Sequence, residues 1–184
     1  MRVTLVALVM VVAGAVGAFA EDIRVLATNK TSTMEKEMNE AADAGYRFAA
    51  VMGGDTALGG SEVVAVMTRA SRNARMQYKL LATGKTSTME KELQQAGDAG
   101  FEYRGQTVFS SAFGGDEVAV ILERDTSAEP VKYQYRVLAT NKTSTMEKEL
   151  RDATAAGFEF VGMTVGKTLI GGDELVSILR RKSS

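Results

Sequence analysis

The chain has 184 residues, with 22 basic and 23 acidic side chains, and it contains no histidine, cysteine or tryptophan. Without histidine and cysteine, Ser-His-Asp and Cys-His catalysis, the usual zinc sites and haem ligation are excluded, and we expect no metal and no cofactor. The two signs of charge nearly cancel, and the one basic cluster lies near the C-terminal end at Arg180, Arg181 and Lys182. We therefore expect no nucleic-acid partner, because such binding needs a basic surface.

Residues 1–20 have the pattern of a secretory signal peptide. Arg2 precedes an almost unbroken apolar run, and Ala18-Phe19-Ala20 forms an A-x-A cleavage site before Glu21. A transmembrane helix needs about 20 apolar residues, and this run is shorter. We predict cleavage before Glu21, export to the periplasm or the extracellular space, and no membrane span after cleavage.

The remainder of the chain consists of three copies of one segment. Arg24 to Arg69, Lys79 to Arg124 and Arg136 to Arg181 align without a gap. Self-similarity of this length indicates a repeat architecture, with short connectors between the copies. The predicted domains are the signal peptide at residues 1–20 and three units at residues 21–70, 76–125 and 132–184.

Each unit is predicted to begin with a strand. Apolar side chains alternate along it, which is typical of a strand with one buried face. The alternating residues are Ile23, Val25 and Ala27 in unit 1, Tyr78, Leu80 and Ala82 in unit 2, and Tyr135, Val137 and Ala139 in unit 3.

A helix is predicted next, within the motif Lys-Thr-Ser-Thr-Met-Glu. A serine stands three residues before a glutamate, the spacing of a capping box, in which each side chain satisfies a free backbone N–H group. The pairs are Ser32 and Glu35, Ser87 and Glu90, and Ser144 and Glu147. Met34, Met38 and Ala41 form the predicted buried stripe of the first helix. A glycine, such as Gly45, ends each helix, because a left-handed terminal residue is favoured without a Cβ.

Two further strands complete each unit. The second strand alternates aromatic residues such as Phe101 and Tyr103, and a Gly-Gly turn leads to the third. The third strand is an apolar run, as in Val118 to Leu122, so we predict a central strand that is buried on both faces. A unit this small buries little surface, so its stability would be marginal if it stood alone. The predicted fold class is α+β, with three tandem βαββ units packed together, helices outward, and a pseudo-threefold arrangement as one option.

Short motifs in these units resemble a known family. Tyr78-Lys79, Gly100-Phe101-Glu102 and Leu122-Glu123-Arg124 mark the first strand, the helix end and the last strand of unit 2. They are similar to the Tyr-Lys-Val, Gly-Trp-Glu and Lys-Arg landmarks of a family of small bacterial βαββ domains, the domain of unknown function number 4177. Phenylalanine stands in place of the family's tryptophan, and unit 1 departs further with Gly45-Tyr46-Arg47. The resemblance implies the βαββ fold and brings no assigned chemistry.

The Lys-Thr-Ser-Thr segments are the candidate binding sites, because a lysine and hydroxyl groups at a helix N-terminus favour an anion. The candidate residues are Lys30, Thr31 and Ser32, Lys85, Thr86 and Ser87, and Lys142, Thr143 and Ser144. Every residue from Arg24 to Glu37 recurs from Arg136 to Glu149, whereas most other positions of the two units differ. A requirement of folding and a binding surface both explain this identity, and both interpretations stay open here.

These features favour a non-enzymatic binding or structural protein that contacts a protein partner or an anionic ligand through the three segments. No residue is assigned a catalytic role. One alternative is an enzyme that uses carboxylates at clefts between units as general acid or base. Its candidates are Glu35, Glu90, Glu147, Asp116 and Asp173. A second alternative is self-association through exposed sheet edges.

Overall fold

The computed structural model describes residues 22–56, 60–70, 75–111, 115–168 and 172–183. The predicted signal peptide and parts of the three Gly-Gly turns lie outside these ranges, so the predictions for them stay predictions. Within the described ranges, no helix combines the length and the apolar character that crossing a membrane requires.

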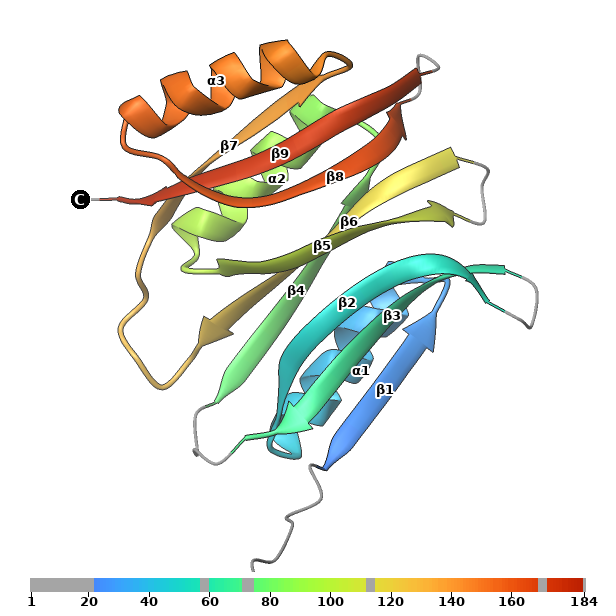
Figure 1. Ribbon diagram of the computed structural model, residues 1–184. Helices are drawn as coiled ribbons and strands as arrows, with labels where there is room; N and C mark the ends of the chain where they lie inside the picture. Colours follow the sequence, from blue (N-terminus) through green and yellow to red (C-terminus); the bar gives the residue numbers. More distant parts are fainter. Residues whose placement is uncertain (1–21, 57–59, 71–74, 112–114, 169–171, 184) are drawn as a thin grey trace, which may run out of the picture.

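The chain forms three βαββ units in sequence order (Figure 1). Unit 1 contains β1 (Ile23–Thr28), α1 (Thr31–Asp43), β2 (Tyr46–Thr56) and β3 (Gly60–Arg69). Unit 2 contains β4 (Met76–Thr83), α2 (Thr86–Asp98), β5 (Glu102–Ser111) and β6 (Gly115–Asp125). Unit 3 contains β7 (Tyr133–Thr140), α3 (Thr143–Ala155), β8 (Glu159–Thr168) and β9 (Gly172–Lys182). The predicted α+β class and three-unit repeat are confirmed.

Each unit has one antiparallel sheet of three strands, with its last strand in the centre. The strand orders are β1-β3-β2, β4-β6-β5 and β7-β9-β8. In β6 every side chain from Val118 to Leu122 is buried. β6 is therefore a central strand buried on both faces, as predicted, because packed elements cover the two sides of the middle sheet. In β3 of unit 1, Val64 and Val66 are only half-buried, so the prediction of two buried faces is wrong for that strand.

The helix ends agree with the sequence prediction. Gly45, Gly100 and Gly157 follow the last helical turns with φ angles of 87°, 83° and 84°. This left-handed conformation strains any residue with a Cβ, so glycine is required there.

The helix starts do not agree, and the predicted capping boxes are wrong. The N-cap residues are Lys30, Lys85 and Lys142, and no side chain caps these termini. The serines of the motif, Ser32, Ser87 and Ser144, lie inside the first helical turn. The boxes do not form because each helix begins at the threonine before the serine, so the serine is the second helical residue and not the N-cap. In units 1 and 2, Glu35 and Glu90 accept hydrogen bonds from the following unit.

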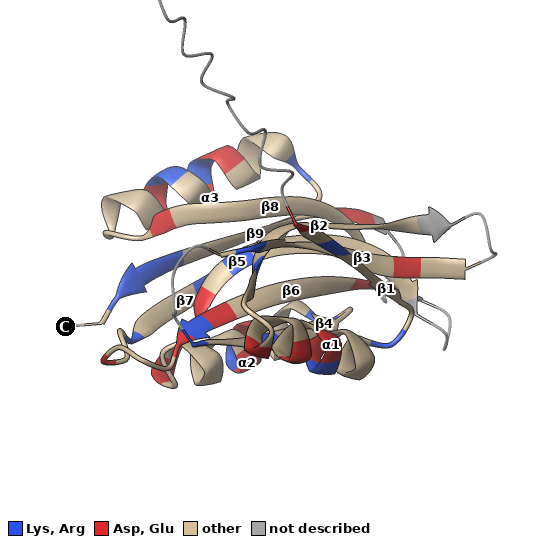
Figure 2. Cartoon of the chain, turned by 90° about the horizontal axis from the view of Figure 1, so that it is seen from below, with Lys and Arg blue, Asp and Glu red and all other residues tan. Residues whose placement is uncertain are grey.

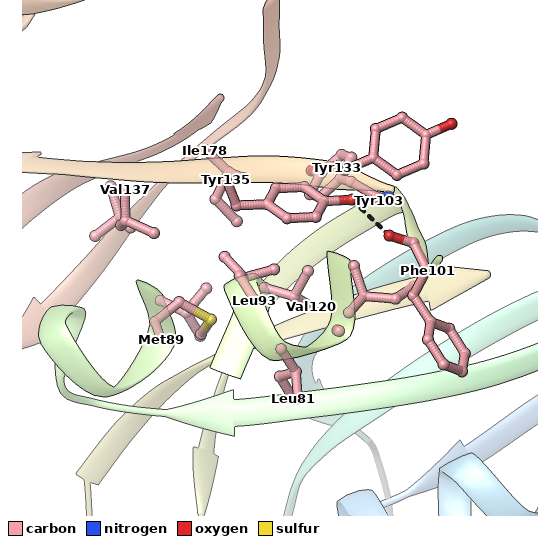
Figure 3. Packing of buried hydrophobic residues seen from close by; sticks show 14 residues of the cluster. Leu81, Met89, Leu93, Phe101, Tyr103, Val120, Tyr133, Tyr135, Val137 and Ile178 are labelled. Carbon is pink, nitrogen blue, oxygen red and sulfur yellow. Dashed lines mark hydrogen bonds between the residues drawn. The ribbon is translucent and has the colours of Figure 1, made fainter. Parts of the chain in front are cut away.

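Shared hydrophobic cores join neighbouring units. One core combines α1 and β3 with β4 and β6, and another combines α2 and β6 with β7 and β9. Figure 3 shows the second core, in which Leu93 of α2 and Val120 of β6 lie close to Tyr135 of β7. The next unit thus covers one side of α1 and of α2, and their other side is exposed, as at Lys36, which is 77% exposed. Helix α3 has no following unit against it. Unit 2 lies between the other two in Figure 1, so the units form an open row rather than a pseudo-threefold ring.

One glycine permits an especially close contact between units. A Cβ at Gly97 of α2 would lie 2.3 Å from the carbonyl oxygen of Tyr133 in β7. This distance is shorter than any van der Waals contact, so a larger residue would push the helix and strand apart. Ala42 of α1 and Thr154 of α3 occupy the equivalent positions, and Thr154 is exposed.

Candidate functional site

The Lys-Thr-Ser-Thr segments lie at the tips of β1, β4 and β7, which point toward the same side in Figure 1. The lysine N–H donates to the hydroxyl of the last strand residue, as from Lys30 to Thr28 at 3.1 Å. The same bond recurs from Lys85 to Thr83 at 3.1 Å and from Lys142 to Thr140 at 3.2 Å. All three lysines are exposed, so their side chains are free to meet a ligand.

The segments have different surroundings. Lys85 and Thr86 line a hollow of about 20 Å³. Its other walls include Asp116 of the same unit and Gly166 of unit 3. This volume holds little more than one water molecule. Lys142, Thr143 and Ser144 border an open hollow whose other walls include Leu150, Met163 and Leu175. The described hollows do not bring the three lysines into one site.

The glutamates of the motif connect the units. The Leu80 N–H of β4 donates to Glu35 Oε2 of α1 at 2.8 Å. At the next junction, the Val137 N–H of β7 donates to Glu90 Oε2 of α2 at 3.4 Å. Each glutamate thus satisfies a backbone donor on the edge strand of the following sheet. This role explains the glutamate in units 1 and 2. Glu147 of unit 3 pairs with Arg151 instead, so the role does not by itself explain the identity between units 1 and 3.

A second polar side chain on each helix extends this junction. Asn39 of α1 accepts from the Tyr78 N–H at 2.9 Å and donates to the Tyr78 carbonyl oxygen at 3.0 Å. Gln94 of α2 accepts from the Tyr135 N–H at 3.1 Å and donates to the Tyr133 carbonyl oxygen at 3.3 Å. Sequence reasoning missed these residues because the equivalent positions carry different residue types, Asn39 and Gln94. A polar residue on a helix also gives no sign that it binds the backbone of a strand.

A tyrosine from the same edge strand enters the preceding sheet at its bulge. The Tyr78 hydroxyl accepts from the Phe48 N–H at 2.8 Å, and the Tyr135 hydroxyl accepts from the Tyr103 N–H at 2.7 Å. Burial raises the pKa of both tyrosines far above the ordinary value, and for Tyr78 the hydrogen bond to Glu123 adds to this effect. The two junctions therefore have the same arrangement. Side chains of the helix form hydrogen bonds with the backbone of the following edge strand, and a buried tyrosine of that strand accepts a hydrogen bond from the preceding sheet.

The outer ends of the row lack this arrangement. Ile23 stands at the tyrosine position of β1, and it is 51% exposed. On α3, Arg151 stands where the other helices have Asn39 and Gln94, and it pairs with Glu147 at 2.7 Å on the surface. The predicted buried face of the first strand is therefore wrong for unit 1, since no preceding unit covers it.

Exposed apolar side chains gather at these two ends. On the outer face of unit 1, Val25 is 64% exposed, whereas the equivalent Leu80 and Val137 are 8% and 7% exposed. Seven large apolar side chains are prominently exposed among the described residues. They are Ile23, Val25 and Met52 at the unit 1 end, Phe160, Met163 and Val165 at the unit 3 end, and Val131 in a connector. Six of the seven thus lie on the two terminal sheets.

A network of charged groups lies between units 2 and 3. The buried carboxylate of Glu123 accepts from the Tyr78 hydroxyl and from Arg104, both at 2.7 Å. Arg104 also approaches Glu102, which accepts from Arg180 of unit 3 at 2.6 Å. Each of these charges has a partner, so the network offers no free acid or base.

The carboxylates considered for catalysis are dispersed. Glu35 and Glu90 bind backbone groups, Glu147 pairs with Arg151, and Asp116 accepts from the Ser110 hydroxyl at 2.7 Å. Within the described part of the chain, no group of three or more acidic residues has a metal-binding arrangement. Basic and acidic residues are interspersed over the helices and strands in Figure 2.

The fold and these junctions define a three-unit α+β repeat protein in which α1 and α2 each dock against the next unit. No family model, curated protein or solved structure matches the chain. The resemblance to the small bacterial βαββ domains therefore rests on the short motifs alone.

Proposed function

We propose that this chain is an exported, non-enzymatic binding or structural protein of the periplasm or extracellular space. Its partner contacts the C-terminal face, defined by Phe160, Met163 and Val165 of β8 together with Leu150 of α3. The observation that carries this proposal is the exposure of large apolar side chains on the terminal sheets. Monomeric soluble proteins rarely leave such groups clustered unless a partner covers them.

The Lys142 segment contributes a polar rim to this face. Lys142 and Ser144 border the same hollow as Met163. A cation and hydroxyl groups beside an apolar patch are typical of the rim of a protein interface. The equivalent Lys30 and Lys85 segments are further candidates for an anionic partner, because each is exposed at the start of a 13-residue helix.

Export is supported by the signal-peptide pattern of residues 1–20. A non-enzymatic role is supported by the absence of histidine and cysteine and by the hydrogen bonds and ion pairs of the candidate carboxylates. The export part is tested on the chain purified after export. Its mass should correspond to a start at Glu21, and an intact leader would contradict export.

The binding part is tested by capture of envelope and secreted proteins on immobilised protein. We expect Val165→Glu to reduce the captured partner at least tenfold, because the interface would bury an unpaired charge. A variant with Lys30, Lys85 and Lys142 replaced by alanine measures the contribution of the three segments. The proposal is wrong if the wild type captures nothing and also shows no association with itself.

A further inference from the structure

The two ends of the row expose equivalents of the two sides of an internal junction. The internal junctions place the first strand of one unit against the helix and sheet of the preceding unit. Unit 1 presents the strand half of this junction without a preceding helix, and unit 3 presents the helix half without a following strand. Ile23, Val25 and Phe160 occupy positions that the internal junctions bury.

We propose that a second copy of this chain docks its unit 1 onto unit 3, so that copies associate head to tail. The contact repeats the α1–β4 and α2–β7 junctions as an α3–β1 junction between molecules. This inference rests on the proposed function and names the partner of the C-terminal face as another copy of the chain.

The apolar surfaces fit this arrangement position by position. Phe160, Met163 and Val165 correspond to Tyr103, Gln106 and Val108 of unit 2, of which Tyr103 is buried and the other two are half-buried against unit 3. On the opposite end, Ile23 and Val25 correspond to the buried Tyr78 and Leu80. Docking would remove both sets from water, which is the main driving force of association.

The hydrogen bonds of the junction can also form. Glu147 is the equivalent of Glu35 and Glu90, and the Val25 N–H is the equivalent of the donors on Leu80 and Val137. Arg151 can donate to the Ile23 carbonyl oxygen, as Asn39 donates to Tyr78. The exposed ion pair of Glu147 and Arg151 contributes little to the stability of the free chain, so breaking it on docking costs little free energy.

Three differences make this contact weaker than the internal junctions. Thr154 of α3 stands where α2 has Gly97 and α1 has Ala42, so its larger side chain keeps the helix farther from the strand. Ile23 lacks the tyrosine hydroxyl that binds the bulge of the preceding sheet. Arg151 has no acceptor for the Ile23 N–H, whereas Asn39 and Gln94 each both donate and accept. We therefore expect reversible, concentration-dependent assembly rather than a permanent oligomer.

The symmetry of the contact gives it a distinctive signature. Each molecule uses one end as donor and the opposite end as acceptor, so the interface is heterologous and association continues beyond the dimer. Val25→Lys disables the unit 1 end, and Val165→Glu disables the unit 3 end. Each variant alone should be monomeric, whereas an equimolar mixture should form a one-to-one dimer through the two intact ends.

The experiment is sedimentation velocity of the wild type, each variant and their mixture over a wide concentration range. Both substituted side chains are exposed, so circular dichroism and Tm should match the wild type. Val131→Lys is the matched control, because Val131 is apolar and exposed but lies in a connector, and it should assemble like the wild type. A variant that keeps dimers while the other loses them would show a symmetric contact and overturn the proposal.

A cross-link gives a second readout in this cysteine-free chain. Val25→Cys mixed with Glu147→Cys should form a disulfide-linked heterodimer at least tenfold faster than either variant links to itself. A wild type that stays monomeric and unlinked at every concentration would overturn head-to-tail docking. In that case, loss of another captured partner in Val165→Glu would leave the proposed function standing, and its unchanged capture would reject both.

Discussion

The α2–β7 junction and the outer side of α3 are built from equivalent positions, yet one is buried and the other meets solvent. At the junction, Gln94 and Glu90 bind the backbone of β7, and Gly97 lets the helix approach closely. On α3, the equivalents of Gln94 and Glu90 are Arg151 and Glu147, which bind each other. The comparison shows that the helix motif serves a neighbouring unit and that its side chains pair locally where the chain provides no neighbour.

The largest expected effect comes from enlarging one side chain on α2, which packs against β7, and the equivalent side chain on α3, which does not. Gly97→Val should lower the free energy of unfolding by about 3 kcal/mol, because the new side chain collides with the Tyr133 carbonyl oxygen. Thr154→Val at the equivalent position of α3 is the control and should change stability by no more than about 0.5 kcal/mol. Urea unfolding of both variants measures the difference. Equal effects would show that α2 is not held against β7.

The second prediction compares the motif glutamates. Glu35→Ala should cost about 2 kcal/mol, because the Leu80 N–H loses its acceptor in a partly buried junction. Glu147→Ala removes only a surface ion pair and should cost no more than about 0.5 kcal/mol. Thermal and urea unfolding check this order. A larger loss for Glu147→Ala at low protein concentration would contradict the inter-unit role of Glu35.

The third prediction concerns the buried tyrosines at alkaline pH. Burial raises the pKa of Tyr103 to about 12, and it also raises the pKa of Tyr135. The unfolded chain loses these protons near pH 10, so above pH 10 it binds fewer protons than the folded chain and stability falls as pH rises. Each tyrosine contributes up to about 1.4 kcal/mol per pH unit until its folded pKa is reached.

Tyr135→Phe isolates one of these contributions. At neutral pH the variant should lose about 1 kcal/mol, because the Tyr103 N–H loses its acceptor. Above pH 10 its stability should fall less steeply than that of the wild type, and unfolding measured at several pH values checks both effects. Parallel curves above pH 10 would show that the hydroxyl titrates normally in the folded chain.

The smallest effect is expected from the lysine segments. Replacing Lys30, Lys85 and Lys142 together with alanine should change stability by no more than about 0.5 kcal/mol, because all three are exposed. A thermal-shift series with phosphate and sulfate then tests anion binding. Stabilisation of the wild type that the triple variant lacks would support anion binding, and an equal response would reject these lysines as the site.

The sequence predicted the secondary-structure elements and the helix ends because these depend on residues that are close together in the chain. The repeat, the four elements of each unit and the central position of the apolar strand followed from register and periodicity, as in Val118 to Leu122. The glycine at each helix end followed equally well, since a left-handed φ at Gly45 is a property of one residue.

The tertiary structure decided what the polar residues of the motif do. A serine and a glutamate at capping-box spacing can satisfy each other, and no local rule reveals that Glu35 accepts from the Leu80 N–H of another unit. The same limit applies to Ile23 and Val25, whose alternation predicts a buried face. Burial depends on a neighbour, and in this chain units 2 and 3 have a preceding unit while unit 1 has none, so identical patterns lead to covered strands inside the row and an open one at its end.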